Sequence, residues 1–195
     1  MLGVVVGWGL KSLSDYLGRR REDIRTYNKS VFFILRAWKN LLDYDRATDY
    51  FRKKKPTSEE FEAWRSILAG QFLENFQDQA ETVSEAVRVL STADPVLATR
   101  LDSTIRRILR TFPSHVSQLA TSDPERYRQL IYNQDYVVDL TLNDFEKVAG
   151  TLSARSGLLP QLRVALYFRS VKRGTKEFTQ GMGEQDEMLN KVVSP

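Results

Sequence analysis

Apolar residues recur every three or four positions through the first part of the chain. Steps of three and four alternate, and only one member of the series is polar: Leu10, Leu13, Leu17, Arg20, Ile24, Tyr27, Val31, Ile34, Trp38 and Leu41. This spacing places all ten along one seam of a helix of about forty residues or more. A long core helix in a bundle is the first interpretation, and a homo-oligomeric coiled coil is the second.

The end of this helix and the start of the next are marked by local signals. Four cations at 52–55 precede Pro56, and proline disfavours the helical conformation in the residue before it. Thr57 and Glu60 form a capping box that starts a second helix. Its apolar stripe consists of Phe61, Trp64, Leu68, Phe72 and Phe76, with a continuation through Val83, Val87 and Leu90.

Two Asp-Pro pairs predict the starts of further helices, because aspartate caps a helix and proline suits its first turn. The helix after Asp94 and Pro95 should end before Pro113, and a short helical piece should cover 114–120. The helix after Asp123 and Pro124 should reach Gly157, with a kink at the β-prone residues 136–138. A last helix should run from about Leu158 to Lys172.

These elements predict an all-α fold, a helical bundle of five to seven helices organised on one long amino-terminal helix. Residues 1–18 form the hydrophobic amino-terminal anchor and the start of the long helix, and residues 19–174 form the α-helical domain. Residues 175–195 contain few large apolar side chains and are expected to be a mobile tail.

Composition narrows the class of protein without naming a reaction. A chain of 195 residues with 42% hydrophobic and 28% charged residues can fold as one domain with a real core. The absence of cysteine excludes disulfides, thiolate metal sites and cysteine nucleophiles. Residues 1–55 hold 13 basic and 6 acidic groups, whereas residues 56–94 hold 2 basic and 8 acidic groups. The basic first segment can therefore pack against the acidic second segment or contact an anionic surface.

The amino terminus is the best candidate for a contact surface. Its apolar part is Leu2, Gly3, Val4, Val5, Val6, Gly7 and Trp8, and the cations that follow it are Lys11, Arg19, Arg20 and Arg21. The stretch is too short to cross a bilayer as an unassisted helix. A glycine pair at four-residue spacing, an interfacial tryptophan and the cations are typical of a shallow or partly inserted anchor. The alternative is that these residues begin the core helix and pack on the bundle.

This start of the chain resembles that of many uncharacterised bacterial proteins. The resemblance covers about the first forty residues, in which the stretch from Gly3 to Leu10 is followed by a polar patch and by Arg19, Arg20, Arg21, Glu22 and Asp23. It implies a short amino-terminal membrane anchor followed by an α-helical cytoplasmic region. It implies no active site.

Residues with catalytic or ligand-binding chemistry form no recognisable motif. His115 is the only histidine, which is too few for the usual zinc site, and the chain has no phosphate-binding loop. The sequence around Gly181 and Gly183 lacks a preceding strand, so it indicates no nucleotide site. Asp43, Asp45 and Asp49 are expected on a solvated helix face. No cofactor, metal or small-molecule substrate is therefore expected, and the chain is predicted not to be an enzyme.

Basic clusters support an alternative function. Three cations lie close together in the helix before Pro113, and two more end the last helix: Arg106, Arg107, Arg110, Lys172 and Arg173. Such residues contact phosphates in nucleic-acid complexes, but no known recognition motif accompanies them.

The sequence therefore predicts a non-enzymatic, membrane-associated interaction or assembly subunit of a bacterial system, in the cytoplasm at the inner face of the membrane. Its partners would be a protein or a second copy, with an anionic membrane surface as a further contact. A soluble nucleic-acid-binding regulator and an accessory subunit of an enzyme complex are the two alternatives.

Overall fold

The structure of the chain is a computed structural model. The structure describes residues 2–54, 83–111 and 123–174, and the isolated positions Phe61, Trp64, Arg65, Leu68, Phe72 and Gly183. Of residues 2–10 it describes only the helical backbone. Every secondary-structure element within these ranges is helical, which confirms the all-α class.

Helix α1 spans Leu2–Lys54, 53 residues that extend about 80 Å at the rise of an α-helix. It confirms the long amino-terminal helix and ends on Arg52, Lys53 and Lys54, whose charges suit the carbonyl end of the helix dipole. Its seam is buried from Tyr27 onward, through Val31, Ile34, Trp38 and Leu41. The spacing predicted from the sequence therefore describes the packed half of α1 correctly.

Helix α3 spans Pro95–Thr111 and follows a helical stretch at 83–93. The Asp94 carboxylate accepts a hydrogen bond from the Leu97 backbone nitrogen at 3.1 Å, which confirms the predicted cap. The predicted stripe is also confirmed, because Leu97, Leu101, Ile105 and Ile108 are all buried.

Helix α5 spans Pro124–Ser156, and Asp123 caps it by accepting from the Arg126 backbone nitrogen at 3.1 Å. The β-prone residues 136–138 do not interrupt the helix, which is continuous through them. Val138 is 2% exposed and lies on the buried face with Leu142 and Phe145. Burial of this face outweighs the weak β-propensity of the valines.

Helix α6 spans Leu158–Arg173. Gly157 separates it from α5 with a φ of 126°, a conformation that favours glycine because it has no Cβ. Both boundaries of this helix agree with the sequence prediction to within one residue.

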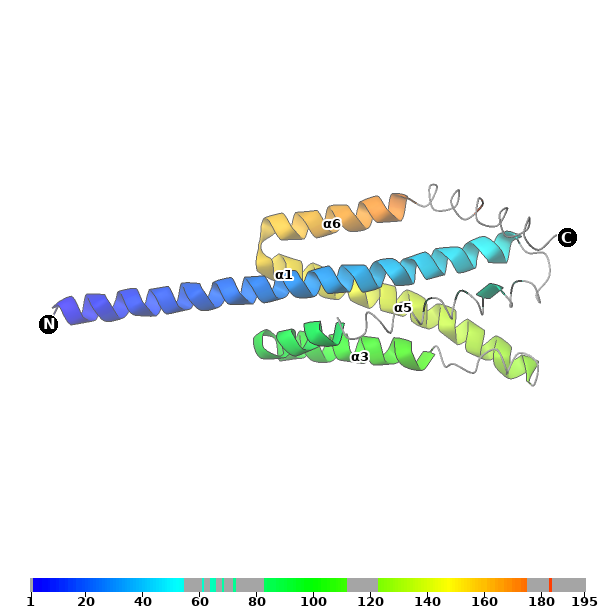
Figure 1. Cartoon of the computed structure of the whole chain (residues 1–195), viewed down its shortest axis with the longest axis horizontal. Helices are drawn as coiled ribbons and strands as arrows, with labels where there is room; N and C mark the ends of the chain where they lie inside the picture. Colours follow the sequence, from blue (N-terminus) through cyan, green and yellow to red (C-terminus); the bar gives the residue numbers. More distant parts are fainter. Residues whose placement is uncertain are drawn as a thin grey trace.

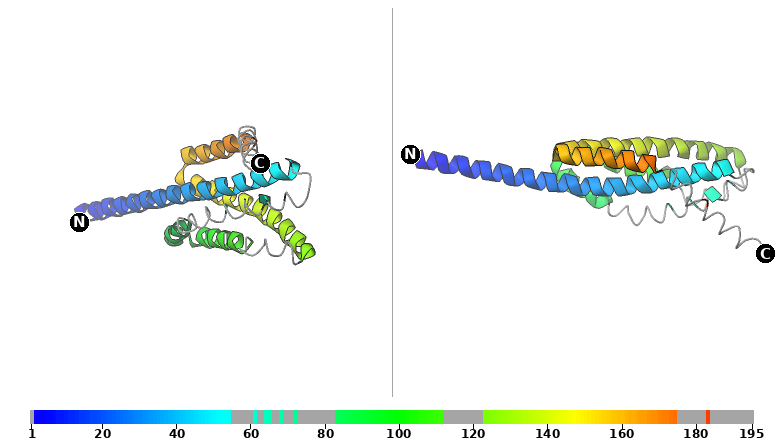
Figure 2. Two further views of the ribbon diagram at one scale, coloured as in Figure 1. Left: turned by 45° about the vertical axis from the view of Figure 1, so that its right-hand side comes forward. Right: turned by 90° about the horizontal axis from the view of Figure 1, so that it is seen from above.

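Helix α5 is the centre of the fold, since α1, α3 and α6 all pack against it. It runs antiparallel to α1, while α6 lies on one side of α1 and α3 lies on the other (Figure 1). The amino-terminal part of α1 extends alone beyond the other helices in every view (Figure 2). We call residues 2–23 the projecting segment and the packed helices the body.

Several sequence predictions lie outside the described residues. They are the capping box at Thr57 and Glu60, the helical piece at 114–120, the surroundings of His115 and the tail at 175–195. The stripe of the second helix is described in part, and there Phe72, Val83 and Leu90 are buried.

Candidate functional site

The projecting segment brings the predicted contact residues to one end of the molecule. Residues 11–23 are all exposed, including Lys11, Arg19, Arg20 and Arg21. The helical backbone continues past them through Leu2, Gly3, Val4, Val5, Val6, Gly7 and Trp8. The segment spans roughly 33 Å at 1.5 Å per residue. The cations and the apolar end therefore lie on a single helix that leaves the body.

Part of the apolar seam is exposed on this segment. The side chains of Leu13 and Leu17 are 55% and 46% exposed, and that of the neighbouring Tyr16 is 60% exposed. Leu13 and Leu17 belong to the same seam as Tyr27 and Val31, which are buried farther along α1. The interpretation of the whole helix as a core element is therefore wrong for residues 11–23, because α3, α5 and α6 end before they reach it (Figure 1).

The basic residues of α3 are mostly engaged in ion pairs. Arg106 Nε lies 2.7 Å from Asp102 Oδ2, and Arg107 Nη1 lies 3.0 Å from Asp144 Oδ2. Arg110 is exposed near the end of the helix. These pairings reduce the positive charge that α3 offers to a nucleic acid.

The second predicted basic group lies on another side of the body. Lys172 Nζ is 2.8 Å from Glu146 Oε1, and Arg173 is exposed at the end of α6. Since α6 and α3 lie on opposite sides of α1, the structure does not bring the two groups together (Figure 1).

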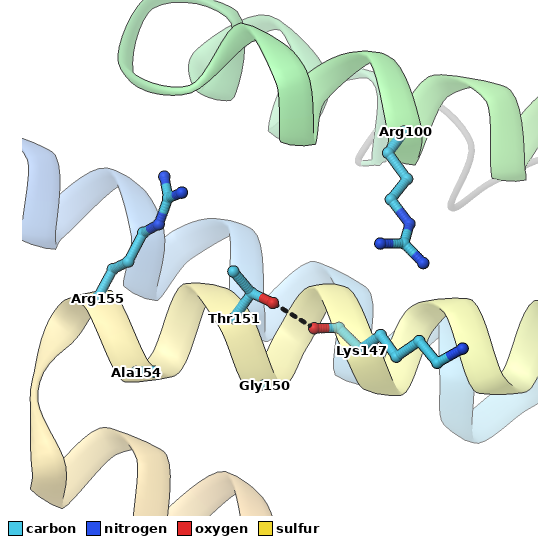
Figure 3. A pocket seen from close by; sticks show the side chains of 6 residues that line it. All are labelled: Arg100, Lys147, Gly150, Thr151, Ala154 and Arg155. Atoms are coloured by element: carbon cyan, nitrogen blue, oxygen red, sulfur yellow. Dashed lines mark hydrogen bonds between the residues drawn. The ribbon is translucent and has the colours of Figure 1, made fainter.

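An open depression of about 730 Å³ lies between α3 and α5. It is lined by Arg100, Lys147, Gly150, Thr151, Ala154 and Arg155. Arg100 extends from α3 toward α5, whereas the other residues lie along α5 (Figure 3). Gly150 and Ala154 leave space for the depression because their side chains are small.

Carboxylates neutralise two of the three cations around this depression. Arg155 forms an ion pair with the buried Asp94, and Arg100 Nη2 lies 3.1 Å from Asp144 Oδ1. Burial raises the pKa of Asp144, but hydrogen bonds from Arg100 and Arg107 outweigh that effect and hold it below its ordinary value. Lys147 has no ion-pair partner among the described residues. The depression is therefore only weakly basic.

The predicted solvated face of Asp43, Asp45 and Asp49 is correct only in part, since Asp49 is exposed whereas Asp43 and Asp45 are half-buried. Burial raises the pKa of Asp45 to about 6, and the nearby charges of Asp49, Asp139 and Asp135 add to the effect. Arg52 partly offsets them. The sequence could not reveal this cluster, because half of it comes from α5.

The depression at Arg100, Lys147 and Arg155 was also missed by the sequence analysis. Lys147, Thr151 and Arg155 follow a four-residue spacing and so share one face of α5, which is a readable signal. Nothing local indicates that Arg100 of α3 lies across from them.

Within the described ranges, no three Asp, Glu, His or Cys side chains gather as they would to hold a metal ion. No helix in that same part of the chain is long and apolar enough to cross a membrane.

Comparisons of the chain with known protein families, with curated proteins and with solved structures find no match.

Proposed function

We propose that the protein is a non-enzymatic, membrane-associated interaction or assembly subunit of a bacterial system. One observation carries the proposal: α1 leaves the body as a single helix, with exposed cations at Lys11 and residues 19–21 and an apolar sequence at residues 2–8. A lone helix with exposed leucines needs a covering surface, because water solvates apolar side chains poorly. The cations favour an anionic covering surface.

The membrane contact is assigned to residues 2–8 and the electrostatic contact to the cations behind them. An apolar stretch of this length gives reversible attachment, since one short hydrophobic signal binds a bilayer only weakly. The exposed part of the seam, at Leu13 and Leu17, is left to bind a protein partner or a second copy, together with the neighbouring Tyr16.

Flotation of the full-length protein with anionic vesicles tests the membrane contact. The informative variant is Val5→Asp, which places a charge in the apolar stretch and should reduce the floated fraction several-fold. The matched control is Val96→Asp, at an exposed position on α3. Equal flotation of both variants and the parent protein would remove the anchor from the proposal.

Sedimentation of the full-length protein in solution and in detergent tests self-association. Leu17→Asp should lower the mass of any oligomer that forms through the seam. A monomeric mass for the parent protein in both conditions would exclude the second copy as the partner.

A further inference from the structure

Helix α6 is apolar on two opposite faces. One face packs into the body through Val164, Tyr167, Phe168 and Val171. The other face carries Leu158, Leu159, Leu162 and Leu166, which are 84%, 68%, 57% and 54% exposed. At 100° per residue these four leucines fall within one quadrant or so of the helix surface. We call them the leucine face.

The packing of α6 on the body keeps this face outward. Phe168 lies edge-on to Trp38 of α1, with ring centroids 4.7 Å apart. Arg46 of α1 donates to the Val171 carbonyl oxygen at 2.7 Å and to the Lys172 carbonyl oxygen at 3.3 Å. A rotation of α6 that turned the leucines inward would break these contacts. The four leucines are therefore exposed when α6 is packed on the body.

Helix α6 itself carries charges of one sign only. The 27 residues at 147–173 contain six Lys or Arg residues and no Asp or Glu. On α6 itself Arg163 flanks the leucines, and Arg169 and Arg173 continue their line toward the end of the helix. All three arginines are exposed.

The leucine face also lies at a distinctive place in the fold. Helix α6 begins at the end of the body from which α1 projects, and it runs beside α1 in the same direction (Figures 1 and 2). The exposed Arg19, Arg20 and Arg21 lie on α1 beyond that same end. Two surfaces that combine cations with apolar residues therefore lie toward one end of the molecule.

From these observations we propose that the leucine face of α6 docks on an anionic lipid surface, with Arg163, Arg169 and Arg173 at the headgroups. A helix with leucines and arginines on its outward side matches the interfacial region of a bilayer, where apolar side chains enter and cations stay at the phosphates. A second copy is a poor occupant, because two surfaces with the same positive charge and no carboxylate repel each other.

This inference rests on the proposed membrane association and adds a second contact to it. Stable attachment of a peripheral protein needs two membrane signals, since one alone is readily reversible. Residues 2–8 would be the first signal, and the leucine face would be the second.

The absence of cysteine allows a direct test, because a single introduced cysteine can be labelled specifically. Leu162→Cys in the full chain would carry an environment-sensitive fluorophore, and Tyr132→Cys, at an exposed position on α5, would be the matched control. With vesicles of phosphatidylcholine and phosphatidylserine, emission from position 162 should shift to shorter wavelength and gain intensity at least twofold. Position 132 should not change.

The result that would overturn the inference is unchanged emission at position 162 while the protein floats with the vesicles. An equal response to pure phosphatidylcholine vesicles would overturn the requirement for anionic lipid. A response to single-stranded RNA or to an acidic protein, without one to vesicles, would replace lipid by that partner and overturn the inference.

Flotation variants separate this inference from the proposed function. The pair Leu162→Ser and Leu166→Ser changes only exposed side chains, so helix content and melting temperature should stay at the parent values. Flotation should fall at least fivefold with this pair. If it stays at the parent value while Val5→Asp abolishes it, α6 is not a membrane contact and the amino-terminal anchor stands. The reverse pattern removes the anchor and retains α6.

Discussion

The indole nitrogen of Trp38 donates a hydrogen bond to Glu146 Oε1 at 3.1 Å, so α1 is joined to α5 through a fully buried side chain. Lys172 of α6 donates to the other oxygen of Glu146 at 2.9 Å. Trp38 also meets the rings of Tyr167 and Phe168, with centroids 6.3 and 4.7 Å away. These contacts fix the position of α6, and with it the outward direction of the leucine face.

Trp38→Phe should destabilise the protein by about 2–3 kcal/mol, because it leaves a cavity and removes the donor to Glu146. The free energy of unfolding from urea titration measures the effect. Tyr132→Phe, at an exposed position on α5, is the control and should stay within about 0.5 kcal/mol of the parent. A Trp38→Phe protein of unchanged stability would show that the junction of the three helices is not tightly packed.

Stability should depend on the protonation of Asp45. The folded-state pKa of about 6 lies above the ordinary aspartate pKa of 3.8. The folded state therefore binds more protons between these values, and stability should rise as the pH falls through 6 toward 4. Asp45→Asn removes the cost of burying a charged carboxylate and its repulsion from the three nearby aspartates, and should add about 1 kcal/mol at pH 8, because solvent screens these charges in part.

At pH 4 the Asp45→Asn protein and the parent should have nearly the same urea midpoint, since the carboxyl is then largely protonated in the parent. Asp23→Asn on the projecting segment is the matched control and should have no such pH-dependent effect. A constant difference between Asp45→Asn and the parent from pH 8 to pH 4 would contradict the assigned pKa.

Asp94 has two roles, as the cap of α3 and as the partner of Arg155. Asp94→Ala should therefore lower the free energy of unfolding by about 2–3 kcal/mol, since it loses the cap and leaves the ion pair without a carboxylate. Asp94→Asn keeps a good cap and should recover about half of the loss. Asp123→Ala loses only an exposed cap and should cost about 1 kcal/mol. Equal losses for Asp94→Ala and Asp123→Ala would show that the contact with Arg155 adds nothing.

Two glycines, Gly150 inside α5 and Gly157 just after its end, should change stability in opposite directions when each is replaced by alanine. Gly157→Ala should destabilise the protein by about 1–2 kcal/mol, because its φ of 126° strains a residue with a Cβ. Gly150 is inside the helix, and a Cβ built there meets no atom within 4 Å. Gly150→Ala should therefore stabilise the protein by about 0.5–1 kcal/mol, as alanine does in a helix interior. Thermal melts of the two variants give the comparison, and a lower melting temperature for Gly150→Ala would contradict it.

Local signals predicted most of the helix boundaries. Asp94 and Asp123 cap their helices through a hydrogen bond three residues along, and Gly157 ends α5 by its own backbone conformation. Such signals act within one turn, so they are readable without the fold. Local signals did not show that residues 136–138 continue the helix without a break, because the burial of Val138 depends on helices that are distant in the sequence.

The contact surfaces were only partly predictable. Residues 2–8 and the cations behind them are contiguous in sequence, so a membrane or partner contact could be proposed there at once. The sequence predicted only the bounds of the last helix and assigned no role to Leu158, Leu162 and Leu166, since periodicity does not tell which of two apolar faces is buried. One signal was readable in the sequence. A helix of 16 residues has a second apolar face opposite the leucines, formed by Val164, Tyr167, Phe168 and Val171.

The amino-acid sequence by itself determined the all-α class, the length of α1 and the caps of α3 and α5, because these follow from periodicity and from hydrogen bonds within one turn. Only the tertiary structure decided that the seam of α1 is covered from Tyr27 onward and exposed before it, that α6 turns its leucines outward, and that Asp45 lies near the carboxylates of α5. Those outcomes depend on where the helices end relative to one another, and helix packing sets that arrangement through contacts between residues far apart in the chain.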